Sequence, residues 1–445
     1  MFRPTGFADL AGRRVGILGY GVEGRASHAR IRQLAARVVL VDDRPDAGSG
    51  VLATFDGGYA ALLECDVVLK SPGIPRRRAD VLELERRGVV VTSALNLWLL
   101  DADRSRVVAI TGTKGKSTTT ALCTFFLGCL GESAQSRGNI GVPPYDPALP
   151  ATSDWIVLEV SSYQCVDLEV APHLVVVTSL GSDHLDWHGS LEQYHDDKLS
   201  LTRAAGPHVT LVPDSAQLRA ARSQLGGDVV EVAPDDEHLA DALGLLGAHN
   251  DSNVALALAA TSRLSQRSLE EVRRAVLERR TNFEPLRGRL TLVADHVARG
   301  GRVRFIDDGL ATAPLPVVAA LTVFSSEPVV LLAGGFDRGV DYTPLAAALG
   351  ARRAPTWVLT MAEAGERVGA ALDEYAPHVV HFPAIDMSAA VARARSLLDD
   401  GGVVLLSPGA PSFGHYRNWE ERSDAFARAV LEVNNEGIFG EDSTS

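Results

Sequence analysis

A segment rich in glycine, lysine and hydroxyl side chains, residues 111–118, has the spacing of a phosphate-binding loop. The β-branched run before it, residues 107–110, predicts a buried strand, and residues 121–127 after it predict a helix. In such a strand–turn–helix unit, glycine N–H groups turn toward the phosphates and the helix N-terminus adds partial positive charge. Lys116 would then reach the outer phosphates, and the Ser117 hydroxyl could bind Mg²⁺.

A carboxylate and an imidazole follow later apolar runs of the same region. Glu159 directly follows the predicted buried strand 155–158, which is a position suited to hold Mg²⁺ directly or through water. A buried Glu without a ligand would need another partner for its charge, so we favour the metal role. His184 lies among acids and a second histidine in the loop 183–189, which could be a metal or phosphate site or a solvated turn.

Further polar residues of the central region fall on or beside predicted helices. Lys198 belongs to the predicted helix 194–201, where a lysine is normally a surface charge. Asn250 and Asn253 precede a predicted apolar helix, 254–260, and lie one helical turn apart. They can therefore present their amides on one face, with helix capping as the alternative.

The N-terminal region carries a glycine-rich turn between a predicted strand and a predicted helix. Gly19, Gly21 and Gly24 fit the dinucleotide-binding fingerprint. NAD, a nucleotide-sugar diphosphate, or a glycine-packed turn without a ligand would each explain this spacing. The loop 71–75 follows another predicted strand, at the end where open α/β sheets bind ligands, although an ordinary turn is the alternative.

Three loops of the C-terminal region, residues 309–314, 334–339 and 407–413, each follow a predicted strand. They are rich in glycine, proline and small hydroxyl residues. Because the carboxyl ends of parallel strands meet at one edge, we expect these loops to form a single rim over a parallel sheet.

The whole chain of 445 residues predicts an α/β protein of three domains: a Rossmann-like domain 1–104, a P-loop domain 105–288 and a Rossmann-like α/β domain 289–445. The net charge of −13 argues against nucleic acid as a partner. No signal peptide or membrane span is evident, and the four cysteines lack metal-ligand spacing, so we expect buried thiols in a reducing, cytoplasmic setting.

An ordered set of motifs gives a more specific indication. With them, the chain resembles the Mur ligases, the cytoplasmic family that extends the peptide stem of peptidoglycan precursors one amino acid at a time. The compact N-terminal region and the Leu-Leu-Ser-Pro-x-x-x-Ser motif at 405–412 resemble the MurD branch, which adds glutamate to UDP-N-acetylmuramoyl-L-alanine. The motifs are Ser-Pro-Gly-Ile at 71–74, Thr-Gly-Thr-Lys-Gly-Lys-Ser-Thr at 111–118, Gly-Asn-Ile-Gly at 138–141, Glu-Val-Ser-Ser-Tyr-Gln at 159–164, Asp-His-Leu-Asp at 183–186 and His-Asn-x-x-Asn at 249–253.

Departures from that branch lie in the C-terminal loops. Enzymes that add D-glutamate usually have Asp-Ser-Lys-Ala-Thr-Asn where residues 308–313 stand here, so their lysine is missing, and commonly have Lys at the position of Arg338. The Gly-Gly-x-Asp-Arg-Gly and Ser-Pro-Gly-Ala-Pro-Ser-Phe-Gly segments of this chain are similar to the rarer relatives that add L-glutamate. In those systems a separate epimerase later inverts the residue. We therefore favour L-glutamate over D-glutamate.

The resemblance implies an ATP-dependent ligase that phosphorylates the precursor carboxylate and lets an amine attack the acyl phosphate. It implies two Mg²⁺ ions, one on Ser117 and Glu159 and one on His184 and a carbamylated Lys198, with Lys116, His184 and Lys198 as catalytic candidates.

The other implied contacts are to the three substrates: ATP, the UDP precursor and glutamate. We expect the protein to be a monomer, with a pathway epimerase as a further partner. For ATP they are Gly112, Thr113, Lys114, Gly115, Lys116, Ser117, Thr118, Asn250, Asn253, Arg289 and Asp337. For the precursor they are Gly19, Gly21, Gly24, Ser71 and Gly73 on the UDP moiety, with Asn139, Ser161 and Gln164 along the muramoyl arm. For glutamate they are Thr312, Ser412, Phe413 and Trp419, the last with plain hydrophobic packing as its alternative.

Alternatives from other classes are an NAD-dependent dehydrogenase fused to a P-loop module and a P-loop switch whose third domain binds a protein. Hydride transfer does not need the polar set between residues 159 and 198, which argues against the dehydrogenase. The folate polyglutamate ligases share the ATP core but usually lack a UDP-binding N-terminal domain.

Overall fold

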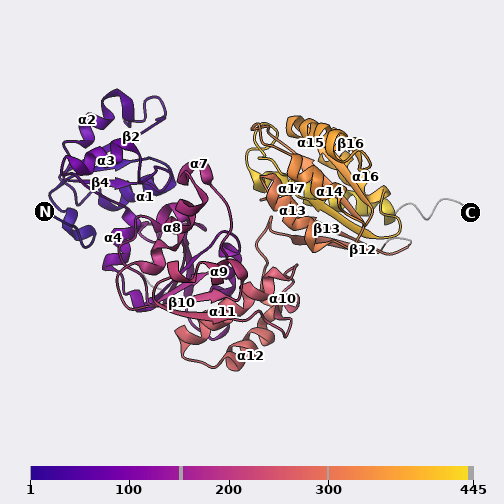
Figure 1. The fold of residues 1–445 in the computed structure, drawn as a ribbon, viewed down its shortest axis with the longest axis horizontal. Coiled ribbons are helices and arrows are strands. Elements are labelled where there is room, and N and C mark those ends of the chain that lie inside the picture. The colour runs from indigo at the N-terminus through magenta and orange to yellow at the C-terminus, as the bar shows by residue number, and fades with distance from the viewer. Residues whose placement is uncertain (1, 150–153, 298–299, 439–445) are drawn as a thin grey trace, which may run out of the picture. The chain divides into compact units, whose positions relative to one another are not determined.

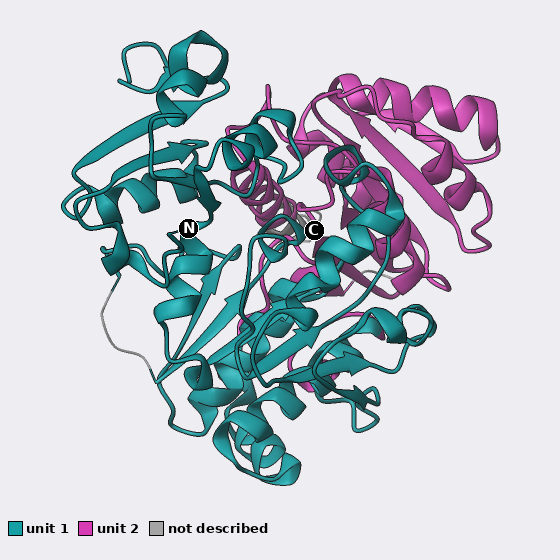
Figure 2. Cartoon of the chain, turned by 60° about the vertical axis from the view of Figure 1, so that its left-hand side comes forward, with its two compact units in different colours: residues 1–239, 249–283 teal, residues 240–248, 284–445 magenta. Residues whose placement is uncertain are grey.

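The computed structural model describes residues 2–149, 154–297 and 300–438, which form three sheets flanked by helices (Figure 1). The chain divides into two compact units, coloured separately in Figure 2. Unit 1 comprises residues 1–239 and 249–283, and unit 2 comprises residues 240–248 and 284–445. The first two sheets belong to unit 1 and the third belongs to unit 2, and the chain passes between the units within α10, Leu239–Ala242.

The first sheet is parallel, with the strand order β3-β2-β1-β4-β5. Its central strands are almost wholly apolar, as expected of a parallel sheet that is covered on both faces. Alternate residues of β1 and β4 pack into two different clusters: Ile17 and Leu69 into one, Leu18 and Val68 into the other. The strands are β1 Arg14–Leu18, β2 Arg37–Asp42, β3 Leu52–Ala53, β4 Val67–Lys70 and β5 Val90–Thr92, with helices α1 Val22–Ile31, α2 Tyr59–Leu62, α3 Ala79–Arg86 and α4 Ala94–Asp101.

The second sheet is also parallel, in the order β11-β10-β9-β6-β8-β7. Its strand β6 is buried along its whole length between β8 and β9, so the loop that leaves β6 starts at the middle of the carboxyl edge. The strands are β6 Val107–Thr111, β7 Ala134–Gly138, β8 Trp155–Glu159, β9 Leu174–Val177, β10 Val209–Pro213 and β11 Asp228–Val232. The helices are α5 Lys116–Cys129, α6 Ser162–Cys165, α7 Leu185–His188, α8 Leu191–Arg203, α9 Ala216–Ala220, α11 His249–Ser265 and α12 Leu269–Arg279.

The third sheet has the order β12-β13-β17-β14-β15-β16 and departs from the expected all-parallel sheet at β12, which runs antiparallel to β13. β13, β17 and β14 are neighbours, which brings the loops after them to one edge. The strands are β12 Thr291–Val297, β13 Arg302–Asp307, β14 Val329–Gly334, β15 Thr356–Met361, β16 Val380–Pro383 and β17 Gly402–Leu406. The helices are α13 Pro314–Val323, α14 Thr343–Gly350, α15 Ala362–Tyr375, α16 Met387–Ser396 and α17 Trp419–Ile438.

The predicted α/β class is confirmed, and the sheet with the phosphate loop is the second of the three along the chain. The three domain ranges stay predictions. One helix begins earlier than expected: α11 starts at His249 instead of Val254, so Asn250 and Asn253 lie inside its first turns. All four cysteines are buried and free, as predicted. Among the described residues, no helix is both long and apolar enough to cross a membrane.

Candidate active site

The loop between β6 and α5 has a backbone that other residues could not adopt. Gly112 and Gly115 have φ angles of 143° and 87°, in the region that favours glycine. A Cβ on Gly112 would overlap the Thr178 hydroxyl, and one on Gly115 would overlap the Asn253 side chain. The loop is therefore fixed by glycine on both sides of Thr113 and Lys114, and Lys116, Ser117 and Thr118 follow as the first turn of α5. This is the expected strand–turn–helix geometry.

Two lysines from distant parts of the chain converge on one carbonyl of this loop. The Nζ atoms of Lys116 and Lys198 each lie 2.9 Å from the Gly112 carbonyl oxygen. Lys198 is only 1% exposed. Burial, and then the neighbouring charge of Lys116, lower the pKa of Lys198 to about 7. A lysine on a helix is normally a surface charge, whereas the fold buries Lys198 beside the phosphate loop. The metal role that the resemblance implies for Lys198 stays a prediction.

The loop before α7 lies at the same edge. Asp183 forms an ion pair of 3.2 Å with Lys114. His184 follows with φ of 50°, a conformation uncommon for a non-glycine residue. Burial lowers the pKa of His184, and among the charged groups Asp183 raises it while Lys116 and Lys198 lower it further. The imidazole is thus kept neutral, the form that binds a metal or accepts a hydrogen bond.

Glu159 is the candidate metal carboxylate. It is 1% exposed and pairs in the sheet with Ile110, at the start of the phosphate loop. Its Oε1 accepts a 2.6 Å hydrogen bond from the Asn139 amide, while its Oε2 is buried without a hydrogen-bond partner among the described residues. Such an atom fits an oxygen ligand for Mg²⁺. No cluster of three or more His, Cys, Asp or Glu side chains in the described ranges is arranged as a metal site, and the expected ligand set includes a serine and a lysine instead.

The asparagines of α11 contact the phosphate loop from the other side. Asn253 accepts from the Thr119 hydroxyl at 3.3 Å and donates to Asn250 at 2.8 Å. Both are buried. Asn253 therefore contacts α5 from within α11, and Asn250 lies about one turn earlier in the same helix and supports it.

The N-terminal glycines serve two different purposes. A Cβ on Gly24 would overlap the carbonyl of Gly19, and one on Gly19 would press on Ser71, whose hydroxyl donates to Gly19 at 2.6 Å. These contacts pack α1 and the loop after β4 closely together. A Cβ on Gly21 or Gly73 would instead meet nothing within 4 Å, so open space lies beside both.

Ser161 and Gln164 form a capping box at the start of α6, and Gln164 also donates to the Glu23 carboxylate at 2.6 Å. Tyr145 donates to the other Glu23 oxygen at 2.9 Å. Burial raises the pKa of Glu23. Sequence reasoning missed this carboxylate. The sequence feature that could have indicated it is the position of Glu23, a glutamate between the second and third glycines of the fingerprint.

The candidates of unit 2 lie around the strand-end rim of the third sheet. Asp337 accepts from Arg367 at 2.7 Å, and Arg289 lies two residues before the start of β12 and is exposed. Trp419 opens α17 and packs so closely on Gly288 that a Cβ there would meet its ring. Ser412 is buried, Thr312 is partly buried and Phe413 is exposed. All of these residues belong to unit 2.

Two charged residues of this rim were not proposed as site residues. Arg422, 2% exposed, donates to the carbonyls of Gly309 and Ala410 at 2.9 Å each and so ties the loops after β13 and β17 together. Burial lowers the pKa of Arg422 to about 10. Burial also raises the pKa of Asp308 to about 7, although the Ser407 hydroxyl donates to it at 2.7 Å. The sequence feature that could have indicated Arg422 is its position one helical turn after Trp419, which was already a candidate.

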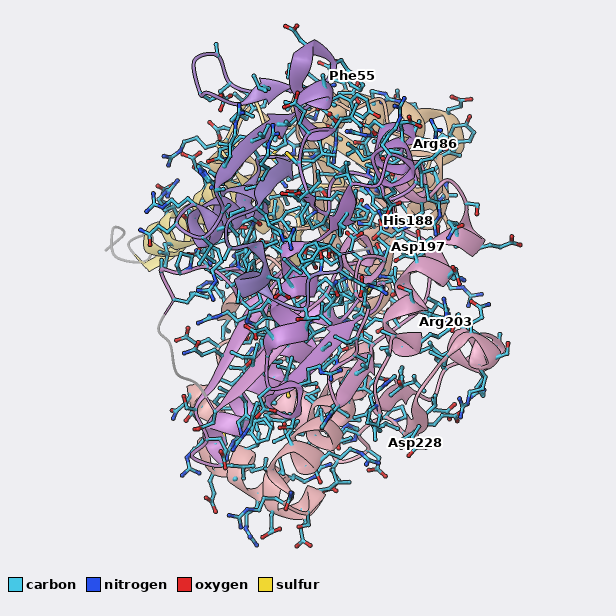
Figure 3. All side chains as sticks on the ribbon, turned by 90° about the vertical axis from the view of Figure 1, so that its left-hand side faces the viewer. Phe55, Arg86, His188, Asp197, Arg203 and Asp228 are labelled. Carbon is cyan, nitrogen blue, oxygen red and sulfur yellow. The ribbon has the colours of Figure 1, made fainter. Side chains whose placement is uncertain are left out.

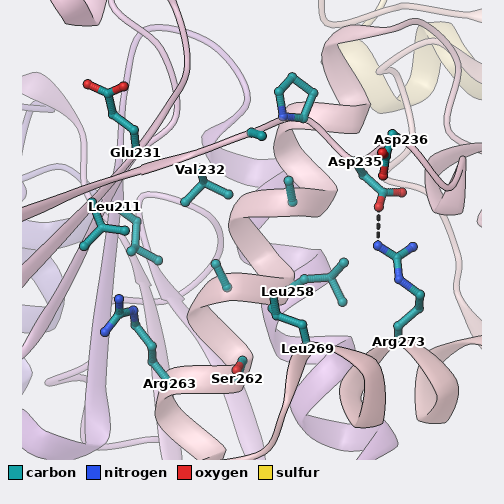
Figure 4. Close-up of a pocket in the computed structure, with 15 residues that line it drawn as sticks. Leu211, Glu231, Val232, Asp235, Asp236, Leu258, Ser262, Arg263, Leu269 and Arg273 are labelled. Atoms are coloured by element: carbon teal, nitrogen blue, oxygen red, sulfur yellow. Dashed lines mark hydrogen bonds and ion pairs between the residues drawn. The ribbon is translucent and has the colours of Figure 1, made fainter.

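A cavity of about 490 Å³ lies elsewhere in unit 1 (Figure 4). Its floor is apolar, and Arg273 pairs with Asp235 at its margin. None of the predicted site residues lines it, so the cavity is separate from the phosphate loop. Its walls come from β10, β11, α11 and α12 and include Leu211, Val232, Leu258, Ser262 and Arg263.

Comparison with known proteins identifies relatives along the whole chain. Residues 110–223 match the Mur ligase middle domain. A UDP-N-acetylmuramoyl-L-alanine–L-glutamate ligase of a Micromonospora species is 40% identical over 460 aligned positions, covering 96% of this chain and 98% of the relative. The enzyme of the same name from Xanthomonas euvesicatoria is 34% identical, covering 95% and 96%.

Solved structures agree at the level of the fold. The UDP-N-acetylmuramate–alanine ligase of Thermotoga maritima has a TM-score of 0.54 at 17% identity, covering 94% of this chain and 99% of that one. The MurF ligase of the same organism, in complex with ADP, also has a TM-score of 0.54, at 14% identity and with 97% of each chain covered.

Proposed function

The chain belongs to the Mur ligase family of ATP-dependent ligases, and from this premise we propose that it joins L-glutamate to UDP-N-acetylmuramoyl-L-alanine. The observation that carries the proposal is the pair of lysines on the Gly112 carbonyl, with the unpartnered oxygen of Glu159 at the same sheet edge. This edge offers positive charge for phosphates and a carboxylate for a divalent cation. A hydride-transfer site would need neither.

The chemistry begins with a carboxylate that cannot react with an amine directly, because its leaving group would be oxide. The carboxylate of the precursor attacks the γ-phosphorus of ATP, the bond to the β-phosphate oxygen breaks, and an acyl phosphate and ADP result. The amine of glutamate then attacks the acyl carbon, inorganic phosphate leaves, and the nitrogen loses a proton as the amide forms. Lys116 stabilises the charge on the transferred phosphoryl group, and the loop N–H groups orient it.

Mg²⁺ fits this site because the buried Oε2 of Glu159, which has no hydrogen-bond partner among the described residues, is a suitable oxygen ligand. Ser117 and Glu159 would hold one ion, and His184 with Lys198 a second. Bound Mg²⁺ would neutralise charge on the phosphate oxygens. An ammonium cannot bind a cation, but a neutral amine can take up CO₂ and release a proton to become an anionic carbamate. The buried Lys198, bonded to a carbonyl and not to a carboxylate, is suited to that modification.

The substrate contacts follow from the same premise. We assign the UDP moiety to Gly19, Gly21, Gly24, Ser71 and Gly73, where the open space beside Gly21 and Gly73 supports close approach of a ligand. Asn139, Ser161 and Gln164 would follow the muramoyl arm; Asn139 donates to Glu159 of β8, and Gln164 donates to Glu23 of α1. We assign adenine and ribose to Asn250, Asn253, Arg289 and Asp337, and glutamate to Thr312, Ser412, Phe413 and Trp419.

The choice of L-glutamate rests on the names of the full-length relatives and on the C-terminal loop sequences. The product of an L-glutamate ligase would then pass to an epimerase that inverts the residue. We propose a monomer that works in the cytoplasm on small molecules alone.

The test is phosphate release by purified protein with ATP, Mg²⁺, bicarbonate and UDP-N-acetylmuramoyl-L-alanine, run in parallel with L- and D-glutamate. We expect phosphate release that needs both the precursor and L-glutamate, with L-glutamate recovered on hydrolysis of the product. Faster release with D-glutamate would reassign the stereochemistry. No release with either enantiomer would overturn the ligase proposal.

A further inference from the structure

A buried carboxylate next to Lys198 gathers side chains from three separate parts of unit 1. Asp197 is 1% exposed, and both its oxygens are occupied. Arg77 donates to them at 3.0 and 2.7 Å, Gln193 donates at 2.8 Å, and the Nδ1 of His188 lies at 2.7 Å. The His188 Nε2 lies 3.0 Å from the Ser162 hydroxyl. Arg77, Asp197, His188, Gln193 and Ser162 are called the Asp197 network below, and Figure 3 shows His188 beside Asp197.

The order Ser162–His188–Asp197 is that of a hydrolase triad, but its surroundings favour another role. Ser162 is 3% exposed, so a substrate carbonyl has no path to its hydroxyl. Asp197 is also bound by a bidentate arginine, which a hydrolase does not need. The network therefore holds elements in place and does not form a second reaction centre.

The network holds α8 on a face next to the one that contacts the phosphate loop. Tyr194 and Lys198 lie four residues apart on one face of α8 and reach Thr113 and Gly112. Gln193 and Asp197 lie four residues apart on a neighbouring face and meet in the network. Contacts on both faces determine the rotation of α8 about its axis, and with it the position of the Lys198 amine.

Arg77 brings the N-terminal sheet into this arrangement. It follows the loop of Ser71 and Gly73, which we assign to the UDP moiety, by only a few residues. The same loop has a second contact, because the Trp187 indole donates to the Gly73 carbonyl at 3.2 Å. Trp187 also packs against Tyr163 in a tilted arrangement, with ring centroids 4.6 Å apart. A shift of this loop would thus be transmitted to both α7 and α8.

We propose that the Asp197 network is a positioning device for ligation: through Arg77, binding of the UDP precursor places Lys198 for its role at the phosphate loop. This rests on the proposed function, since it takes Lys198 to be part of the reacting site. Arg77 and Asp197 touch no reacting atoms and act only through the helix that carries Lys198.

The test uses Arg77, because its side chain is 51% exposed and its loss opens no cavity in the core. The variants are Arg77→Met and Arg77→Lys, and the matched control is Arg87→Met, which removes an exposed arginine paired with Glu83 on α3. Steady-state kinetics are measured for each substrate. The Lys198 carbamate is measured by ¹³C NMR of full-length protein in ¹³C-bicarbonate, with and without the precursor.

We expect Arg77→Met to lower kcat about tenfold to a hundredfold, the range for a misplaced catalytic group, and to raise KM for the precursor but not for ATP. In wild-type protein the precursor should increase the carbamate signal, and in Arg77→Met this increase should be lost. Arg77→Lys should recover part of kcat, and Arg87→Met should behave as wild type.

The outcomes separate the two proposals. Wild-type kcat and a wild-type response of the carbamate in Arg77→Met overturn the positioning role. The positioning role is also overturned if Arg77→Lys and Arg77→Met have equally low kcat and equally lowered Tm. That result would mean that Arg77 serves folding instead. Absence of any carbamate signal in active wild-type protein overturns the role of Lys198 itself, and with it the coupling built on Lys198.

Discussion

The phosphate-loop edge of unit 1 and the strand-end rim of unit 2 treat buried charge in opposite ways. In unit 1, Lys116 and Lys198 approach the same carbonyl oxygen, an arrangement in which like charges repel. In unit 2, the buried Arg422 donates to two different carbonyls, those of Gly309 and Ala410, and so joins two loops. At the first edge two cationic side chains share one acceptor, whereas at the second edge one cationic side chain holds two loops together.

This difference separates a binding edge from a scaffold. Charged groups that repel one another in the protein are expected where a ligand of opposite charge binds. Two lysines and a helix N-terminus would bind phosphates, which are anions. Two of the three nitrogens of the Arg422 guanidinium donate to backbone carbonyls, so this side chain holds two loops of the rim together. Substitutions should therefore cost activity at the first edge and stability at the second.

The largest effect is expected from Lys198→Ala. Turnover should fall about a thousandfold, as for loss of a preorganised charged group, while the Tm should not fall, because a buried cation beside Lys116 is removed. Added acetate or formate should restore part of the activity by supplying an oxygen ligand where the carbamate would lie. Phosphate release measures the turnover and a thermal melt measures the Tm. Full activity in the variant would refute the role of Lys198.

The next effect lies in unit 2. Arg422→Met should lower the free energy of unfolding by about 2–4 kcal/mol, because the carbonyls of Gly309 and Ala410 lose their donor in a buried place. The matched control is Arg428→Met on the exposed face of the same helix, with an expected change within about 0.5 kcal/mol. Urea unfolding compares the two. Equal stabilities would contradict the structural role of Arg422.

The contrast between the two edges also shows what could be predicted from sequence. The phosphate loop was predictable, because backbone angles open only to glycine leave a local mark at Gly112 and Gly115. The burial of Lys198 left no such mark: its helix looks amphipathic, and only the packing of α8 against the loop makes that position interior. The partners Arg77 and Asp197 are 120 residues apart, so nothing local connects them.

The third prediction concerns pH and Asp308. Its pKa in the folded protein is about 7, against an ordinary value of 3.8, so between these values the folded state holds a proton that the unfolded state has released. Stability should therefore fall as pH rises through this window and level off above it. Asp308→Asn removes the titration, so the Tm of wild type relative to this variant should decrease from about pH 5 to about pH 8. A constant difference in Tm would show that the carboxyl group is not shifted.

The smallest effect should come from the exposed pair at the phosphate loop. The Lys114 side chain is 64% exposed, and its 3.2 Å ion pair with Asp183 faces solvent, so Lys114→Ala should change the free energy of unfolding by less than about 1 kcal/mol. The same variant should bind ATP more weakly, because one of the charges that faces the phosphates is gone. Urea unfolding measures the free energy of unfolding, and ATP titration measures the affinity for ATP. A large loss of stability with unchanged ATP affinity would mean that this edge, like the rim of unit 2, uses its charges to hold the fold together.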